Sequence, residues 1–151
     1  MIIRKARIED LPVLLEYEQG IINVERPFDP TLRKGIIHYY DIAKMISADH
    51  IEIVVAEIDG KIIGSGYARI EKAKPYLDHT EYAYLGFMFV DPGYRGRGVN
   101  AKIIETLKQW ALSRNLAEIQ LDVYAENVSA IKAYEKMGFT KHLINMRLGI
   151  K

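Results

Sequence analysis

The feature that most constrains this chain is a glycine-rich turn, residues 93–98, between a strand-like segment and a helix-like one. The preceding segment, 81–90, is rich in aromatic residues, which is typical of a strand. The following segment, 98–114, has apolar residues at helical spacing. A strand that turns through glycines into a helix presents unpaired backbone N–H groups at the start of that helix. We therefore expect an α/β fold in which this turn can bind a ligand.

The composition of the turn is that of an anion cradle. Gly93, Gly96 and Gly98 let the backbone curl and take positive φ values. The helix start contributes free N–H groups and the positive end of the helix dipole. Arg95 and Arg97 add positive charge. Together these features predict a loop that binds a pyrophosphate.

The turn differs from two common phosphate-binding motifs. It does not end in Gly-Lys-Ser/Thr, and it lacks the G-x-G-x-x-G fingerprint of dinucleotide sites. A disordered Arg-Gly tail that binds nucleic acid is disfavoured, because this run lies between a strand and an amphipathic helix. A plain tight turn with solvated arginines is the alternative that the loop alone leaves open.

The rest of the chain alternates between strand-like and helix-like segments. We expect strands over 2–6, 51–58, 61–73, 81–90, 117–124 and 139–149, and helices over 9–22, 31–48, 98–114 and 127–137. Asp59-Gly60 suits a two-residue hairpin turn. Gly86, inside a strand, indicates a bulge or a close backbone approach. The order βααβββαβαβ predicts a mixed sheet with helices on both faces.

Length and composition limit the classes of protein. A chain of 151 residues predicts a single domain, 1–151, and a net charge of +1 is too small for a typical nucleic-acid module. The chain has no cysteine, and its four histidines lack the spacing of metal ligands, so no metal site is indicated. The N-terminus has no signal-peptide core, and no apolar run reaches the roughly 20 residues that span a bilayer. We expect a cytoplasmic protein without nucleic-acid or membrane partners.

The strand and turn resemble a signature of the GNAT superfamily of acyl-CoA N-acyltransferases. That signature is Q/R-x-x-G-x-G/A, placed after a strand that ends in Val-Asp-Pro. This chain has Val-Asp-Pro at 90–92, and Arg95 and Gly98 occupy motif positions. Asn100 stands where the family has Gly or Ala, and its larger side chain could crowd the phosphates.

A second segment, 127–139, resembles the family's N-x-x-A-x-x-x-Y-x-x-x-G-F signature at each named position. The resemblance covers nearly the whole chain in element order and is weakest over 20–50, the region that shapes the acceptor site in this family. Asn127 is also a plausible helix N-cap, and Tyr134 shares an apolar helix stripe. A purely structural role for either residue stays open.

The resemblance implies a fold, a cosubstrate and a reaction. The implied fold is a mostly antiparallel mixed sheet with splayed central strands. The implied reaction moves an acetyl group from acetyl-CoA to a primary amine by direct attack in a ternary complex, and dimerisation is common in the family. The residues implied for cofactor binding are Phe89, Val90, Arg95, Gly96, Arg97, Gly98, Val99, Asn100, Ala101, Asn127 and Tyr134.

Catalytic candidates follow from the same resemblance. Tyr134 matches the residue that protonates the departing CoA thiolate. A branch of the family has a glutamate base six residues before the strand-ending valine, and this chain has Tyr84 there. Because tyrosine is a poor base at neutral pH, the other candidates are Glu81, His79 or a water held by the Tyr82 and Tyr84 hydroxyls. Each of them could equally serve an ordinary structural role.

Three functions remain open at the level of the sequence. A near-neutral chain without an extended charged groove favours a small-molecule amine as the acceptor. The alternatives are a protein or peptide amine, and a non-catalytic module that only binds acyl-CoA. The family-matching tyrosine favours catalysis over binding alone.

Overall fold

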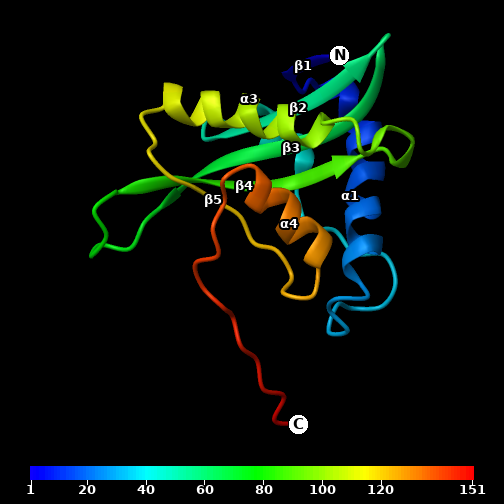
Figure 1. Cartoon of the computed structure of the whole chain (residues 1–151). Coiled ribbons are helices and arrows are strands. Elements are labelled where there is room, and N and C mark those ends of the chain that lie inside the picture. Colours follow the sequence, from blue (N-terminus) through cyan, green and yellow to red (C-terminus); the bar gives the residue numbers. More distant parts are fainter.

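A five-stranded sheet with its strands in chain order forms the centre of the structure, a computed structural model that describes all 151 residues (Figure 1). The strands are β1 (Ile2–Lys5), β2 (Ile51–Ile58), β3 (Lys61–Lys72), β4 (Glu81–Val90) and β5 (Ile119–Gln120). Neighbouring strands are antiparallel except β4 and β5, which are parallel. This confirms the predicted mixed, mostly antiparallel sheet.

Four α-helices cover this sheet: α1 (Leu11–Glu25), α2 (Ile42–Ser47), α3 (Val99–Ser113) and α4 (Val128–Lys136). Short 3₁₀ turns, Ile8–Asp10 and Pro92–Tyr94, precede α1 and follow β4. None of these helices combines the length and the apolar character that a membrane-crossing helix needs.

The helices lie on both faces of the sheet, as predicted. Successive side chains of β2 alternate between two hydrophobic clusters, because strand residues point to opposite faces in turn. Ile53 and Val55 pack in the cluster that includes α1 and α2. Val54 and Ala56 pack in the cluster that includes α3, and Tyr134 of α4 lies against its edge.

A bulge interrupts β4 beside Gly86. Tyr67 of β3 pairs with Gly86, and Ser65 pairs with Phe89, so two β4 residues face one β3 residue between these pairs. Phe87 takes a φ of 57°, which is unusual for a bulky residue. A Cβ on Gly86 would lie 2.6 Å from the Tyr67 ring and hydroxyl. The glycine therefore permits a close approach, and the bulge lies next to it.

The central strands splay apart, as the family resemblance implied. The β4–β5 pairing consists of Ala83 with Ile119 and Tyr84 with Gln120. Residues 121–123 make no backbone hydrogen bond within the chain, so the strand expected over 117–124 is much shorter than predicted. The last part of β4, residues 85–90, consequently has no partner strand on that side.

The predicted helix over 31–48 is wrong for residues 31–41, and only α2 near its end is helical. Gly35 has a φ of 86°, outside helical geometry. The Glu18 carboxylate, fully buried on α1, accepts the backbone N–H groups of Tyr39 and Tyr40, each at 2.9 Å. Its other oxygen lies 2.7 Å from Nδ1 of His38. The Glu18 carboxylate thus accepts backbone N–H groups that would otherwise donate to carbonyl oxygens within a helix.

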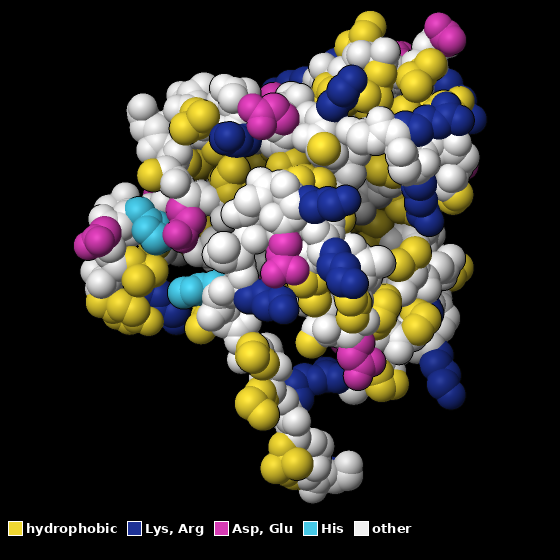
Figure 2. All heavy atoms as spheres, viewed as in Figure 1, with side chains coloured by type: hydrophobic (Ala, Val, Ile, Leu, Met, Phe, Trp, Pro, Cys, Tyr) yellow, Lys and Arg dark blue, Asp and Glu magenta, His cyan; other side chains and the backbone are white.

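The predicted strand over 139–149 is also not formed. Gly138, with a φ of 101°, ends α4, and the chain then runs away from the sheet (Figure 1). No backbone group of residues 140–151 is hydrogen bonded. The apolar side chains of this tail are 85–89% exposed, and they stand clear of the body of the protein in Figure 2. The segment lacks a partner strand within its own chain.

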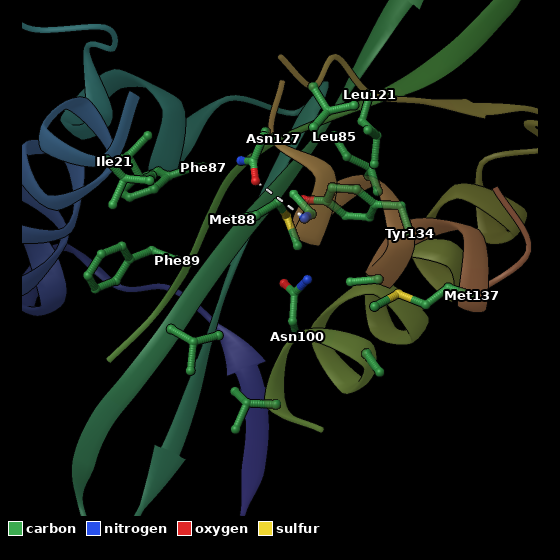
Figure 3. A pocket seen from close by; sticks show the side chains of 18 of the residues that line it. Ile21, Leu85, Phe87, Met88, Phe89, Asn100, Leu121, Asn127, Tyr134 and Met137 are labelled. Atoms are coloured by element: carbon green, nitrogen blue, oxygen red, sulfur yellow. Dashed lines mark hydrogen bonds between the residues drawn. The ribbon is translucent and has the colours of Figure 1, made fainter. Parts of the chain in front are cut away.

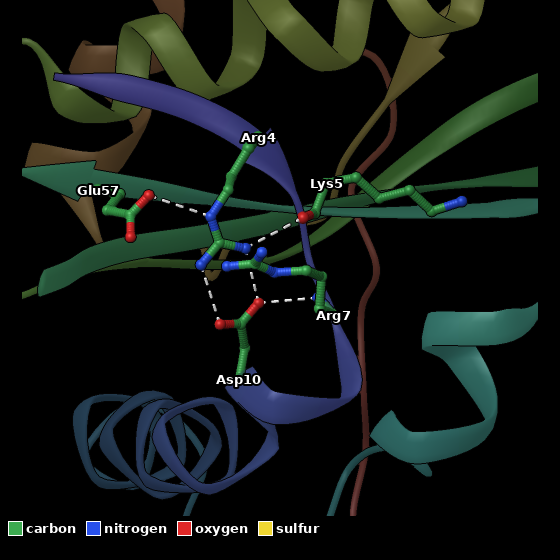
Figure 4. A network of polar contacts seen from close by, with 5 residues as sticks. All are labelled: Arg4, Lys5, Arg7, Asp10 and Glu57. Carbon is green, nitrogen blue, oxygen red and sulfur yellow. Dashed lines mark hydrogen bonds and ion pairs between the residues drawn. The ribbon is translucent and has the colours of Figure 1, made fainter. Parts of the chain in front are cut away.

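A polar network fixes the start of α1 against the sheet (Figure 4). The Arg4 guanidinium donates two hydrogen bonds to Asp10, at 2.8 and 3.0 Å, and a third to Glu57 at 3.1 Å. Asp10 also accepts the Arg7 backbone N–H at 2.8 Å. Hydrogen bonding to Arg4 is the main reason why the pKa of Asp10 lies below its ordinary value. The network therefore stabilises the fold while Asp10 is ionised.

Asp10→Asn removes the charge from this network. We expect the free energy of unfolding to fall by about 1–3 kcal/mol at neutral pH, because charge-assisted hydrogen bonds are lost. A depressed carboxyl pKa stabilises the fold above its unfolded-state value, near pH 4, and this contribution disappears as the pH falls through the folded-state pKa. Urea unfolding should thus show a smaller difference between wild type and variant in acid. Asp49→Asn, at an exposed position, is the control. Equal stability of wild type and Asp10→Asn at neutral pH would contradict this role.

Candidate active site

A cavity of about 460 Å³ opens where β4 and β5 diverge. It is lined by the unpaired part of β4, the segment 121–124, the glycine-rich loop, the start of α3, the length of α4 and the end of α1. Figure 3 shows side chains from these elements converging on one space. A cavity of this size, mostly apolar with a few polar groups, is typical of a small-molecule site.

The glycine-rich loop forms an open backbone cradle at one end of this cavity. Gly96 and Gly98 have φ values of 77° and 76°, and a Cβ on either would meet no atom within 4 Å. Gly98 is the N-cap of α3 and offers no capping side chain. No N–H group of residues 96–101 donates a hydrogen bond within the chain. Six consecutive donors are therefore free for an anion at the positive end of a helix dipole.

The two arginines of the loop take different positions. Arg95 donates from Nε to the Val90 carbonyl oxygen at 3.0 Å, and its guanidinium lies over the Phe89 ring. It lines the cavity. Arg97 lies over the Tyr94 ring, 5.3 Å from its centroid, and is outside the cavity lining. Of the two predicted cationic partners, Arg95 is the one that reaches the cavity.

Asn100 projects from the start of α3 toward Tyr134 in Figure 3. Its side-chain oxygen is buried and has no hydrogen-bond partner in the chain. A buried polar atom without a partner is costly unless a ligand or water completes it. The residue that departs from the family motif thus supplies a free acceptor on the cavity wall.

Tyr134 and Asn127 lie on the opposite wall. Burial raises the pKa of the Tyr134 hydroxyl, and the neighbouring Asn100 side chain acts in the other direction. The Tyr134 ring makes an edge contact with Phe139. Asn127 caps α4, with its side-chain oxygen accepting the Ala130 N–H at 3.3 Å. The predicted N-cap at Asn127 is confirmed. Because its pKa is raised, the Tyr134 hydroxyl stays protonated at neutral pH.

Tyr84 is joined to a carboxylate that the sequence did not reveal. Its hydroxyl donates to Oδ2 of Asp122 at 3.0 Å. Burial first, and then the Asp122 charge, raise the pKa of Tyr84. Tyr84 is therefore a hydrogen-bond donor and a poor base. The sequence held one indication of this contact. If the expected strands 81–90 and 117–124 are neighbours in the sheet, Tyr84 and Asp122 can lie close together.

Glu25 is a second carboxylate that the sequence did not reveal. It lies at the end of α1, lines the cavity, and has a pKa raised mainly by burial. A neighbouring cavity of about 500 Å³ adjoins this region. It is lined by Tyr39, Tyr40, Tyr67, Arg69, Glu71, Tyr82, Tyr84, Gly86 and Asp122. Tyr84 and Asp122 line both cavities, so they stand at the junction between them.

Most of the predicted site residues are brought together, and a few are not. Glu81 is the exposed first residue of β4 and lines neither cavity. His79 lies 3.2 Å from the Glu118 carboxylate, away from both cavities. The predicted residues that line the cavity between β4 and β5 are Tyr84, Phe89, Val90, Arg95, Gly96, Gly98, Val99, Asn100, Ala101, Asn127 and Tyr134.

Known proteins with similar sequences are acetyltransferases. Aminoglycoside N(6')-acetyltransferase type 1 of Salmonella typhimurium is 30% identical over 105 residues, which cover 68% of this chain and 71% of that protein. Streptothricin acetyltransferase of Escherichia coli is 38% identical over 85 residues, or 56% of this chain and 45% of that protein.

Solved structures share the whole fold. A mutant of the BH1408 protein from Bacillus halodurans superposes with a TM-score of 0.90 at 18% identity, covering 100% of both chains. The aminoglycoside N-acetyltransferase AAC(6')-Iy in complex with CoA gives a TM-score of 0.74 at 22% identity, covering 98% of this chain and 99% of that one. The Acetyltransferase (GNAT) family matches residues 19–139, which include both the glycine-rich loop and the Asn127–Phe139 segment. The chain therefore belongs to the GNAT family of acetyltransferases.

Proposed function

We propose that this protein transfers the acetyl group of acetyl-CoA to a primary amine of a small, cationic molecule. The observation that carries the proposal is the row of six free N–H groups at 96–101, which leads into the gap between β4 and β5. A diphosphate fits the row, and an extended acyl arm fits the gap. The free Asn100 oxygen and the open space at the two glycines also fit such a cosubstrate.

The unpaired side of β4 supports the placement of the thioester. Asp91 donates its N–H to the Ile63 carbonyl oxygen of the β3 side at 2.8 Å. Along a strand, the backbone N–H groups of successive residues point to opposite sides. Since the Asp91 N–H points to β3, the Val90 N–H faces the gap and the Phe89 N–H faces β3. We assign the stabilisation of the developing oxyanion to the Val90 N–H. Phe89 then acts through its ring, which packs against Tyr17.

The far end of the cavity is suited to a cationic acceptor. The Glu25 and Asp122 carboxylates line it, and tyrosine rings surround the adjoining cavity. Carboxylates and aromatic faces both attract ammonium groups. The aminoglycoside and streptothricin acetyltransferases among the relatives support a small-molecule acceptor.

The residues can be given ordered roles. Asp122, held by the Tyr84 hydroxyl, takes a proton from the acceptor ammonium, and the free amine attacks the thioester carbonyl. The Val90 N–H holds the resulting oxyanion. When the C–S bond breaks, Tyr134 donates its proton to the thiolate, and the new ammonium nitrogen returns a proton to the phenolate. The products are an N-acetyl amine and CoA.

The energetics constrain the role of Tyr134. Proton transfer from a phenol, titrating near 10, to a thiolate, titrating near 8.5, is uphill by about 2 kcal/mol. Burial raises the pKa of Tyr134 and increases this difference. The donation must therefore be coupled to proton return from the acetylated nitrogen. The same raised pKa keeps Tyr134 protonated, and so able to donate, across the whole neutral range.

A screen of acceptors tests the proposed function directly. Purified protein is given acetyl-CoA and one amine at a time, and free CoA thiol is measured. We expect turnover with small polyamino compounds such as aminoglycosides, and little with neutral peptides that offer one α-amine. Robust acetylation of the peptides with inert small amines would overturn the acceptor class. CoA binding without thiol release on any amine would overturn catalysis.

Tyr134→Phe keeps the ring and its contact with Phe139 while removing the hydroxyl. We expect kcat to fall by about 10²–10⁴, the range of general acid–base catalysis, with little change in acetyl-CoA affinity. Steady-state kinetics and titration calorimetry separate the two quantities. Tyr76→Phe, an exposed position, is the control. Wild-type turnover in Tyr134→Phe would make Tyr134 a packing residue.

The two carboxylates should differ in kinetics. Asp122→Asn should lower kcat by about 10²–10⁴, because the base is removed. Glu25→Gln should instead raise KM for the acceptor. Burial raises the pKa of Glu25, so this carboxylate loses its charge at a higher pH than an ordinary glutamate. As the pH is lowered, the KM for the acceptor should therefore begin to rise at a higher pH than an ordinary glutamate would cause. The reverse result, with kcat lowered mainly in Glu25→Gln and the acceptor KM raised mainly in Asp122→Asn, would exchange the two assignments.

A further inference from the structure

Asn100 departs from the family motif and also carries a buried, unpaired polar atom. The motif has Gly or Ala at this position, and neither residue has a polar side-chain group. The Asn100 side-chain oxygen is buried and accepts no hydrogen bond within the chain. A buried polar atom without a partner lowers the stability of the fold, so its presence calls for a functional explanation.

Asn100 and Tyr134 lie on facing walls of the cavity between β4 and β5. Asn100 is the second residue of α3, Tyr134 belongs to α4, and both line that cavity. Figure 3 shows the Asn100 side chain directed toward the Tyr134 side of the cavity. Burial raises the pKa of Tyr134, whereas hydrogen bonding by the Asn100 side chain lowers it. The Asn100 amide is therefore placed to act on the Tyr134 hydroxyl.

The proposed role of Tyr134 decides which end of this amide faces the hydroxyl. A tyrosine hydroxyl has one proton to donate, and an asparagine amide has two N–H donors and one acceptor oxygen. If Tyr134 protonates the CoA thiolate, its O–H points to the sulfur and cannot also donate to Asn100. Asn100 must then be the donor, with Nδ2 toward the Tyr134 oxygen. This orientation leaves the Asn100 oxygen without a partner in the chain, as observed.

A donor at this position makes the proton transfer from Tyr134 easier. Burial weakens the phenol as an acid, and without Asn100 the phenolate would form in a mostly apolar cavity with no side-chain donor beside it. A hydrogen bond to a charged group contributes more to stability than one to a neutral group. The Asn100 N–H would therefore stabilise the phenolate more than the phenol, and so favour the transfer.

We propose that Asn100 is a positioning residue for Tyr134: its amide N–H holds the Tyr134 oxygen, directs the hydroxyl proton toward the departing sulfur and stabilises the phenolate. As the C–S bond breaks, its electron pair passes to sulfur and the Tyr134 proton is transferred to that sulfur. The new ammonium nitrogen then returns a proton to the phenolate. The inference rests on the proposed role of Tyr134. Because Gly and Ala have no side-chain amide, the contact belongs to this chain and not to the motif.

NMR spectra of the free, isotope-labelled protein test the contact without any turnover. The side-chain N–H signals of Asn100 are identified as those lost in Asn100→Leu. We expect these signals to move strongly in Tyr134→Phe, because the ring is kept and only the accepting oxygen is removed. The side-chain amide of Gln109, on the exposed face of the same helix, is the internal control and should keep its signals. Unmoved Asn100 signals would overturn the contact.

Kinetics of double variants test the consequence of the contact. Asn100→Leu keeps the approximate size of the side chain and removes the amide. At saturating acetyl-CoA we expect kcat to fall about 10- to 100-fold, because one hydrogen bond to a charged group is lost. In the Tyr134→Phe background the same change should cost nothing further, since Asn100 acts through the hydroxyl. Asn100→Ala, which cannot overpack the cavity, should show the same pattern. Gln109→Leu removes an amide from the exposed face of α3 and should leave kcat unchanged.

The outcomes separate this inference from the proposed function. If the two losses multiply in the double variant, Asn100 acts independently of Tyr134 and the inference is overturned. It is also overturned if Tyr134→Phe is impaired while Asn100→Leu and Asn100→Ala keep the wild-type kcat. A wild-type rate in Tyr134→Phe would instead overturn the proposed role of Tyr134 itself.

Discussion

The short pairing of β4 with β5 is the constraint on which the site depends. After Ala83 and Tyr84 the two strands separate, and the last residues of β4 keep one side free of backbone partners. Buried strands rarely leave N–H groups unpaired, because each unpaired group is costly. The opened side of β4 is therefore best understood as a binding surface, with the glycine-rich loop at one end and two carboxylates at the other. On its other side, β4 pairs with β3, and the bulge at Phe87 shifts the register of that pairing within the same part of the strand, residues 85–90.

The proposed acceptor end of the cavity depends on an interaction between distant segments. The buried Glu18 carboxylate holds the backbone of Tyr39 and Tyr40, and with it the irregular segment before α2. Tyr40 then stacks on Phe87 and makes an edge contact with Tyr67. Through these contacts α1, the irregular segment and the bulged strand form one wall. The acidic and aromatic character of this wall follows from that packing, and in the proposed function it selects the kind of amine that reaches the thioester.

The sequence predicted the features that local chemistry determines. The positive φ values of Gly96 and Gly98 and the cap at Asn127 depend on residue types within a few positions, and they are confirmed. Glu25 and Asp122 were not predicted, because only the folded sheet brings the end of α1 beside the segment after β5. The helix expected over 31–48 failed because Glu18, far away in sequence, captures its N–H groups. The tail at 139–149 has the alternating pattern of a strand, but no strand of the sheet pairs with it.

The central claim is that the free N–H groups of 96–101 hold the diphosphate of the cosubstrate while β4 holds its acyl arm. Amide NMR spectra of the labelled protein test it most directly, with CoA and pantetheine titrated separately. CoA should shift the amide signals of Gly96, Gly98 and Asn100 strongly, together with those of residues 85–90. Pantetheine, which has no phosphates, should shift only the β4 signals. If CoA leaves the 96–101 amides unchanged, or if both compounds perturb them equally, the account of the cradle is wrong.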